Sequence, residues 1–389
     1  MTETDNRPFG GRDDMLQRVQ TQLANAPHEP LVVIGRKSIG KTAFLYQVAN
    51  TAPQQAVVIF MPLNDMPIDD ETHFWVMMSQ YILDTVQAYG FTLPDIVMDE
   101  DARAWVTGQF FPAISKVLRQ RHLWILWDDA HHLLQENFSE GFLGTLRGLC
   151  NAYVQMVFAL DIAYEDMLGQ LMPFITPKHQ LRLGNLSLEA CEAILHDYDD
   201  SLGNDMIEAI YMATGGVPYL IQAYGDELRQ HADIKSMNNA VYTRIQANFL
   251  AIWESATTDE RLVLTAIADL FYDDPLRPIF TTTIATWSAR SDYLLDETTI
   301  NAALRGLLYD EIITMKANQI SINGELFRKW LLENARISAD KSTEKPTIPI
   351  SLMMGAVVVL GILFLIIVLS LGGTPNSGGE IIPTVTLLP

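Results

Sequence analysis

The chain has 389 residues, which is enough for two or three domains, and 49% of them are apolar. Its formal net charge of −21 argues against a general binder of nucleic-acid backbones, which depends on clustered Lys and Arg. The two cysteines, Cys150 and Cys191, lack a C-x-x-C spacing, so we expect ordinary thiols in a reducing compartment. Residues 1–30 are polar and acidic, and we expect no N-terminal signal peptide.

The N-terminal part predicts an amphipathic helix, then a strand, a glycine loop and a second helix. Apolar residues at 15, 16, 19 and 23 have helical spacing, and Leu31 to Ile34 form an apolar run typical of a buried strand. Gly35 to Thr42 reads G-R-K-S-I-G-K-T, which fits the phosphate-binding pattern G-x-x-x-x-G-K-[ST]. A chance match in a glycine turn is the alternative, and the strand before and the helix after the loop argue against it.

Each residue type in this loop has a physical reason to be there. Gly35 and Gly40 let the backbone turn tightly and point its N–H groups at phosphate oxygens. Lys41 brings positive charge to the β- and γ-phosphates, and the Thr42 hydroxyl can ligate Mg²⁺. The following helix adds the positive end of its dipole. The expected nucleotide-binding residues of the loop are Gly35, Arg36, Lys37, Ser38, Ile39, Gly40, Lys41, Thr42 and Ala43.

A second signature is an apolar strand that ends in two acids. A strand over 56–61 and helices over about 74–89 and 102–120 lead to Leu123–Trp127, which runs directly into Asp128 and Asp129. At the carboxyl end of a parallel strand, Asp128 can hold Mg²⁺ through water, and Asp129 can polarise the attacking water as the catalytic base. The alternative is an acidic surface turn. Asp129 is also one methylene shorter than the Glu that most such enzymes carry there.

The remaining elements of this module alternate between helix and strand. We expect a helix near 139–151, a strand over 154–160 that ends in Asp161, a short helix over about 163–171 and a strand over 179–183. This alternation predicts an α/β fold with a parallel sheet and crossover connections. Asp161 lies where a residue can sense the γ-phosphate, but an acid is a poor phosphate sensor, and a helix N-cap is the favoured reading.

Residues 6 to about 335 resemble the AAA+/STAND-type P-loop ATPases, especially their archaeal-ATPase-like branch. The resemblance rests on Phe9-Gly-Gly-Arg12, on Gly35–Thr42 as Walker A, on Leu123–Asp129 as Walker B and on Thr214–Pro218 as the lid motif. It implies an ASCE/AAA+-type sheet, ATP and Mg²⁺ as cofactors, Phe9 and Arg12 near the adenine, and contact between Pro218 and the nucleotide. It also implies a nucleotide-dependent homo-oligomer in which an arginine acts in trans.

The chain departs from the family pattern at several positions. Met15 stands where an acid is common, the acid pair is Asp-Asp rather than Asp-Glu, and Asp161 stands where several STAND groups have arginine. The last two departures concern hydrolysis more than binding, so we expect a slow ATPase. Arg147 and Arg182 are the nearest candidates for the trans-acting arginine, and a solvated surface charge is the favoured alternative for each.

We expect helical stretches over about 188–197, 204–214 and 218–231. As bare sequence they form a helix–turn–helix break, and the resemblance implies that they form a lid over the nucleotide. Ser187 is a plausible N-cap for the first of them. Gly215 and Gly216 end the middle helix and Pro218 begins the next, which is the common placement of glycine after a helix and proline in its first turn.

Residues 256–335 predict a winged-helix-like unit. Helices over 257–268 and 297–308 precede a hairpin of strands 312–315 and 319–322, and a last helix begins at 327. In DNA-binding winged helices the penultimate helix enters the major groove. Here that helix carries one Arg against two acids, and Asp310-Glu311 follows it, so we expect contact with a protein partner and consider nucleic acid unfavoured.

The C-terminal end predicts a membrane helix. Residues 350–371 form an uncharged stretch of about 22 residues, enough to cross a hydrocarbon core of about 30 Å. Basic residues precede it and none follows it, which by the positive-inside rule places the ATPase in the cytoplasm and the tail outside. The Gly-, Pro- and Thr-rich tail is expected to be disordered.

These readings give a domain plan and three functional hypotheses. The plan is an ATPase domain (1–184), a helical lid (185–250), a winged-helix-like domain (251–337), a linker (338–349), a membrane helix (350–371) and an extracytoplasmic tail (372–389). The first hypothesis is a single-pass cell-membrane ATPase acting as a nucleotide-dependent switch with an unknown protein partner, in signalling or bacterial defence. The alternatives are a DNA-handling AAA+ ATPase and a nucleotide-binding membrane scaffold with little hydrolysis.

Overall fold

The chain divides by its contacts into two units, Met1–Arg336 and Ile337–Pro389, and all described residues belong to the first. The predicted linker, membrane helix and tail (338–389) therefore lie outside the described residues. Among the helices that are described, none combines the length and apolarity needed to cross a membrane. The computed structural model describes residues 8–25, 29–66, 68–93, 101–119, 121–134, 138–139, 141–151, 153–165, 177–230, 233–291, 293 and 295–336.

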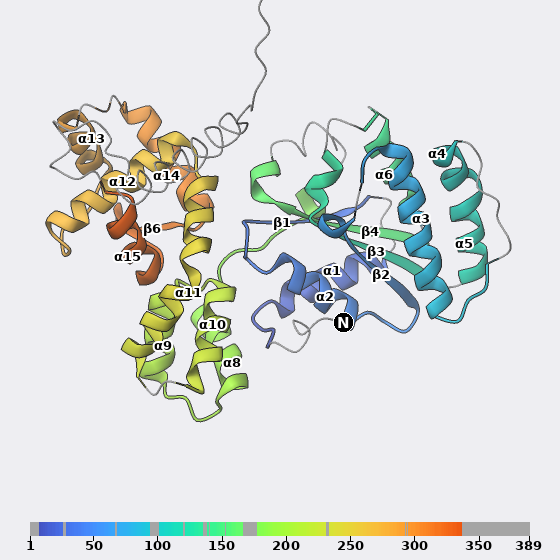
Figure 1. Cartoon of the computed structure of the whole chain (residues 1–389), viewed down its shortest axis with the longest axis horizontal. Coiled ribbons are helices and arrows are strands. Elements are labelled where there is room, and N and C mark those ends of the chain that lie inside the picture. The colour runs from blue at the N-terminus through green and yellow to red at the C-terminus, as the bar shows by residue number, and fades with distance from the viewer. Residues whose placement is uncertain are drawn as a thin grey trace, which may run out of the picture. The chain divides into compact units, whose positions relative to one another are not determined.

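A parallel five-stranded sheet with the strand order β2-β3-β4-β1-β5 forms the first part of the chain (Figure 1). All five strands were predicted from their apolar runs, and the sheet fits a P-loop NTPase α/β fold. Their bounds are β1 Leu31–Gly35, β2 Ala56–Pro62, β3 His122–Asp128, β4 Val154–Asp161 and β5 Gln180–Arg182.

The register brings the chemically important strand ends to one edge of the sheet. β4 lies between β1 and β3, and Gly35 at the end of β1 pairs with Asp161 at the end of β4. Asp128 ends β3 and pairs with Pro62 of β2. Because all strands are parallel, the start of the glycine loop and both acidic strand ends lie at the same carboxyl edge.

Helices cover both faces of the sheet, and the alternation of side chains along each strand supplies the two cores. Val33 and Trp124 pack on one face with α1 and α2, whereas Val32 and Ile125 pack on the other face with α3, α5 and α6 (Figure 1). The bounds are α1 Asp13–Ala24, α2 Lys41–Asn50, α3 Glu71–Ala88, α4 Ala102–Trp105, α5 Phe111–Leu118 and α6 Phe142–Leu149, with short helices η2 Leu63–Asp65, η4 Ala130–Leu134, η5 Ile162–Tyr164 and η6 Pro177–His179.

The helix predicted over 102–120 is interrupted in its middle. α4 passes into a π-helical segment, η3 Val106–Phe110, before α5 begins. Pro112 lies in the first turn of α5 and has no N–H for the carbonyl of Gly108, and its ring would collide with that carbonyl. A wider π-turn relieves this collision, so the predicted helical stretch is confirmed but contains a π-helical segment.

The helices predicted for the lid are confirmed, and one long helix follows that the sequence reading omitted. These helices are α8 Leu188–Tyr198, α9 Asn204–Thr214 and α10 Pro218–Leu228, and their role as a lid stays a prediction. Ser187 caps α8 by accepting a hydrogen bond from the backbone N–H of Ala190, as predicted. The omitted helix, α11 Ile234–Ser255, is 22 residues long and includes residue 250, where the lid was predicted to end.

The last part of the unit combines helices with a hairpin. The order is α12 Thr258–Asp273, α13 Thr281–Arg290, α14 Glu297–Tyr309, β6 Ile313–Lys316, β7 Gln319–Ile322 and α15 Glu325–Asn334, of which α13 was not predicted. β6 and β7 pair antiparallel through Ala317 and Asn318, whose φ angles of 48° and 64° match the primed turns that close tight hairpins. Residue Ile279 adds an isolated bridge to Ile320. That this arrangement is a winged helix stays a prediction.

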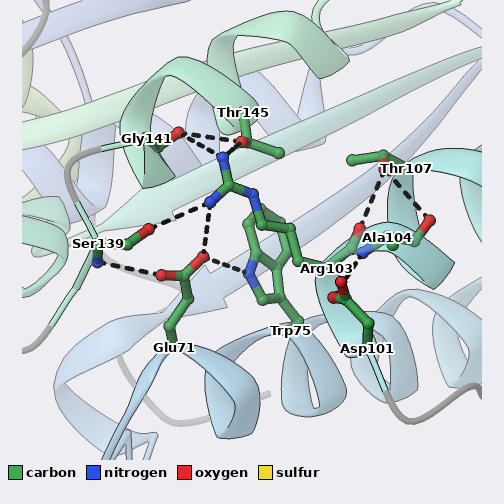
Figure 2. Close-up of polar contacts among 9 residues, drawn as sticks. All are labelled: Glu71, Trp75, Asp101, Arg103, Ala104, Thr107, Ser139, Gly141 and Thr145. Carbon is green, nitrogen blue, oxygen red and sulfur yellow. Dashed lines mark hydrogen bonds and ion pairs between the residues drawn. The ribbon is translucent and has the colours of Figure 1, made fainter.

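A polar cluster around Glu71 and Arg103 joins three helices on one side of the sheet (Figure 2). One Glu71 oxygen accepts a hydrogen bond from the Trp75 indole at 3.1 Å and the other from the backbone N–H of Ser139 at 3.0 Å. Arg103 lies 3.5 Å from Glu71 and donates to the carbonyl of Gly141 at 2.9 Å and to the hydroxyl of Ser139 at 3.1 Å. The cluster therefore anchors the start of α6 to α3 and α4.

We expect Glu71→Ala to lower the free energy of unfolding by about 1–3 kcal/mol, because it removes the acceptor for the indole N–H of the buried Trp75 and for the backbone N–H of Ser139. Burial favours a higher pKa for Glu71, but the hydrogen bonds from Ser139 and Trp75 and the charge of Arg103 outweigh it and lower the pKa. The contribution of Glu71 is thus present above the ordinary glutamate pKa and lost as the pH falls through the lowered pKa. Urea unfolding at pH 7 and pH 3, with exposed Glu208→Ala as control, measures this. Equal losses for both variants at pH 7 would contradict the assignment.

Candidate functional site

The glycine loop between β1 and α2 has the backbone shape of an anion site. Ser38 and Gly40 have φ angles of 65° and 91°, in the left-handed region that turns successive N–H groups inward. The two glycines are required for different reasons. Gly40 needs its positive φ, and a Cβ there would meet no atom within 4 Å, whereas a Cβ on Gly35 would lie 2.6 Å from Ile39.

Lys41 begins α2, and its ammonium group is buried in the loop. The side chain is 8% exposed, and Nζ donates to the carbonyls of Gly35 at 2.8 Å and Arg36 at 3.1 Å. It also lies 3.5 Å from Asp161. Burial lowers the pKa of Lys41, and the charges of Asp161 and Asp129 oppose that shift. The loop's own carbonyls and one acid therefore satisfy this cation.

Thr42 and Asp128 lie together, as a magnesium site of a P-loop protein requires. The Thr42 hydroxyl donates to one oxygen of Asp128 at 2.7 Å, and Asp128 is 6% exposed. Its other oxygen is buried and has no partner among the described residues, and burial raises the pKa of this carboxyl. The described residues contain no cluster of three or more acidic, His or Cys ligands. Two oxygen ligands with one free acceptor suit Mg²⁺, which takes its other ligands from water and phosphate.

Asp129, the predicted catalytic base, has an unusual backbone. Its φ of 50° is uncommon for a residue with a Cβ, although Asp tolerates it better than most. Its carbonyl accepts a hydrogen bond from the N–H of His132 at 3.1 Å, which begins η4 directly after the strand. Such local strain concentrates at functional positions. The side chain is half-buried next to Asp128, and its role as base stays a prediction.

Asp161 makes two contacts. It caps η5, as predicted, and it pairs with Lys41, which was not predicted. Its side chain accepts from the N–H of Ala163 at 3.1 Å and so caps η5, as the N-cap reading required. The same carboxylate pairs with Lys41 across 120 positions of sequence. Asp161 is therefore the counterion of the loop lysine.

Phe9 and Arg12, which precede α1, contact α2 and the backbone of the glycine loop. The Phe9 ring lies 6.4 Å from the ring of Phe44 in α2. Arg12 donates through Nη2 to the carbonyls of Ile39 at 2.7 Å and Gly184 at 3.0 Å, and burial lowers its pKa to about 10. Its Nη1 is buried without a partner among the described residues. The predicted proximity of Phe9 and Arg12 to adenine stays a prediction.

The loop residue Arg36 connects to the C-terminal part of the unit. Its guanidinium donates to the side chain of Asn185 at 2.6 Å. The backbone N–H of Asn185 donates to the carboxylate of Glu311, and its side chain donates to the Glu311 carbonyl at 3.3 Å. Burial lowers the pKa of Arg36, and the charges of Glu311 and Asp310 oppose this. Asn185 and Glu311 were not predicted as site residues, and no local pattern marks them.

Both candidates for a trans-acting arginine, Arg182 and Arg147, have partners inside their own chain. Arg182 donates to the carbonyl of Tyr309, stacks 3.3 Å from the centre of its ring and lies 3.5 Å from Asp310. Burial raises the pKa of Asp310 to about 6, and Arg182 opposes this shift. Arg147 lies 3.8 Å from Glu29, just before β1 and thus at the amino edge of the sheet. A trans role for either stays a prediction.

The predicted lid motif, Thr214–Pro218, forms hydrogen bonds with two other segments. One is the segment after β5, and the other follows β7. Gly215 and Gly216 have φ angles of 62° and 77°, and the Gly216 carbonyl accepts from the N–H of Leu186 at 2.7 Å. Asn323 donates to the carbonyl of Gly215 at 3.2 Å. Pro218 follows as the first residue of α10 and is half-buried. Its contact with nucleotide stays a prediction.

Comparison with known proteins identifies similar structures but no similar sequences. No family model and no curated protein matches the chain. A Walker-type ATPase of Pyrococcus abyssi is similar at a TM-score of 0.59 and 12% identity, covering 82% of this chain and 95% of that one.

Two further structures are similar at lower scores. The Aeropyrum pernix ORC2 protein, solved in ADPNP–ADP complexes, has a TM-score of 0.49 and 13% identity, covering 84% of this chain and 92% of that one. A STAND protein with a tetratricopeptide-repeat sensor from Pyrococcus horikoshii has a TM-score of 0.37 and 14% identity, covering 87% of this chain and 45% of that one. At such identities a likeness concerns the fold, and the first structure carries the conclusion: this chain has the fold of a Walker-type P-loop ATPase.

Proposed function

We propose that the protein binds ATP with Mg²⁺ and hydrolyses it slowly, and that the bound nucleotide sets the state of the whole 1–336 unit. One observation carries the proposal. The Thr42–Asp128 hydrogen bond, with an unpaired Asp128 oxygen, lies at the same sheet edge as the buried Lys41. Cation, metal ligands and backbone N–H groups then meet where phosphoryl transfer needs them.

In this proposal each residue performs a defined task. The N–H groups of Gly35–Thr42 hold the phosphate oxygens, and Lys41 leaves the loop carbonyls to contact the β- and γ-phosphates. Thr42 and Asp128 hold Mg²⁺, which neutralises charge that develops on the phosphates. Asp129 accepts a hydrogen bond from the attacking water and takes its proton.

Phosphate release by the full-length protein tests the enzymatic part. We expect Lys41→Ala and Asp128→Asn to lower the rate by about 100-fold or more, because each removes charge stabilisation at the reacting phosphate. Asp129→Asn should lower hydrolysis while nucleotide binding is retained. Lys116→Ala, an exposed lysine in α5, is the matched control and should not change the rate. Equal turnover in all variants would exclude hydrolysis at this site, and binding without turnover in the wild type would favour the scaffold alternative.

For Asp161 we expect substitution to have a favourable effect, an increase in the affinity for nucleotide. Its carboxylate pairs with Lys41 and would repel the terminal phosphate. We therefore expect Asp161→Asn to raise the affinity for Mg·ATP by about 2- to 5-fold, the range of a part-exposed ion pair. Titration with a fluorescent ATP analogue in the presence of Mg²⁺ measures this. An unchanged or lower affinity would show that Asp161 does not compete with the nucleotide.

The contacts of Arg36 and Gly215 support a switch rather than a simple enzyme. Gly215 contacts Asn323, which follows β7, and Arg36 of the loop is linked through Asn185 to Glu311, which precedes β6. A nucleotide that moves either segment would therefore act on this part of the unit. We propose that ATP and ADP favour different arrangements, with nucleotide-dependent self-association as the output in signalling or bacterial defence. A protein partner is favoured over DNA, because α14 carries a single arginine and the chain has a net charge of −21. A salt-dependent shift of DNA would support the DNA-handling alternative instead.

We further propose that residues 350–371 anchor the chain in the cell membrane, with the ATPase unit in the cytoplasm and the C-terminus outside. The support is the sequence alone, an uncharged stretch of about 22 residues with basic residues only before it. The full-length protein should stay with membranes in a carbonate wash, and a chain ending at 340 should be released. After detergent extraction, the full-length protein should have a larger mass in ATP than in ADP. Release of the full-length protein by carbonate would exclude the anchor.

A further inference from the structure

His131 lies between the carboxyl ends of β3 and β4, and the sequence reading did not single it out. It is the second residue of η4, two positions after Asp129. Its ring stacks on Tyr164 with centroids 4.8 Å apart and planes 16° apart, and it packs against His132 at 4.5 Å. Tyr164 ends η5, three positions after Asp161. The imidazole is therefore held by the segments that follow both acidic strand ends.

These two strand ends border the glycine loop. β4 lies next to β1, and Asp161 pairs in register with Gly35. The charges of Asp129, Asp161 and Lys41 all affect the pKa of His131, which places the imidazole within electrostatic reach of the loop lysine and both acids. Burial is the main cause of its lowered pKa, and His132 adds to it. The ring is consequently neutral at pH 7, with one nitrogen that donates and one that accepts.

One ring nitrogen lacks a hydrogen bond. Nδ1 of His131 is buried and has no partner within the part of the chain that the structure describes. A buried polar atom without a partner costs about 1–3 kcal/mol relative to a satisfied one. The stack on Tyr164 fixes the ring plane, so the nitrogen cannot reach solvent by a small rotation. A ligand that supplies an acceptor at this place would remove the cost.

The terminal-phosphate end of the loop is short of donors. Lys41 is the cation at that end, and Asp161, next to it, offers only acceptor oxygens. Arg36 is bonded to Asn185, and Arg182 is bonded to Tyr309 and Asp310. A neutral imidazole has an N–H to donate, and His131 is held between the segments that follow the two acidic strand ends. It therefore offers the donor that this end lacks.

We propose that His131 contacts the terminal phosphate of a bound nucleoside triphosphate, with Nδ1–H donating to a phosphate oxygen, and that it thereby distinguishes triphosphate from diphosphate. The inference rests on the nucleotide binding proposed above and assigns the residue that reads the third phosphate.

Equilibrium binding tests the proposal without hydrolysis. The affinities of the full-length protein for Mg²⁺ complexes of β,γ-imido-ATP and of ADP are compared in four forms: wild type, His131→Phe, His131→Asn and His122→Phe. Phe keeps the stack on Tyr164 but has no nitrogen, and Asn places an amide N–H near the position of Nδ1. His122 lies at the opposite end of β3 and is the matched control.

We expect His131→Phe to weaken the triphosphate analogue by about 10-fold or more while ADP changes by less than about 2-fold, as loss of one charge-assisted hydrogen bond requires. His131→Asn should recover most of the loss, and His122→Phe should match the wild type. A thermal unfolding midpoint measured for each form identifies losses caused by misfolding.

Three outcomes would overturn the inference. An unchanged triphosphate affinity in His131→Phe would show that the ring only packs, and so would an equal loss of both nucleotides. Failure of His131→Asn to recover affinity, in a protein that unfolds at the wild-type temperature, would exclude the Nδ1–H donor. If the wild type binds neither nucleotide, the proposed function itself fails, which separates that failure from the others.

Discussion

The buried ammonium group of Lys41 is the charge around which the site is arranged. Burying a lone cation in a protein is costly, and the structure compensates it with two loop carbonyls and the carboxylate of Asp161. Asp128 and Asp129 add two more carboxyl groups close by. One ammonium group among three carboxyl groups leaves this part of the site short of positive charge. A divalent cation would offset part of the negative charge of the carboxyl groups and phosphates, and the unpaired oxygen of Asp128 could bind it.

The same lysine links the loop to distant parts of the chain. Lys41 donates to the carbonyl of Arg36, the Arg36 side chain donates to Asn185, and Asn185 donates to Glu311. Glu311 has a φ of 54°, an uncommon backbone conformation for a glutamate. Each link is a direct hydrogen bond, so the path is physically continuous from the phosphate site to the loop before β6. A continuous path does not by itself couple the phosphate site to the loop before β6. Coupling requires that nucleotide binding changes the free-energy difference between two arrangements of that loop.

The sequence was most informative where function depends on neighbouring residues. The strand, loop and helix around Gly35–Thr42, and the strand that ends in Asp128, are local patterns, and their elements were predicted with nearly correct bounds. The partners of that loop were not predictable, because Asp161 and Asn185 lie 120 and 149 positions from Lys41 and Arg36. Only the fold brings such residues together.

The π-helical segment η3 and the helix α11 were both missing from the sequence prediction, for different reasons. The π-turn at η3 depends on how Pro112 meets the carbonyl one turn earlier, which hydrophobic spacing does not encode. α11, in contrast, carried a readable signal: Asp233 caps it, and Met237, Val241 and Ile245 recur at intervals of four. For His131, the sequence shows part of the signal but not all of it. Its position after the acid pair is visible in the sequence, but its stack on Tyr164 and its unpaired nitrogen are not.

The contacts of Lys41 with the Gly35 and Arg36 carbonyls bear on how strongly this lysine can hold a phosphate. Its ammonium group already has two carbonyl acceptors and the carboxylate of Asp161 within the protein, so contact with a phosphate exchanges these interactions for new ones. Because one set of hydrogen bonds replaces another, the net free energy gained from this lysine is smaller than the full strength of an ammonium–phosphate contact. The preference for phosphate then depends on the difference between two sets of partners for one side chain.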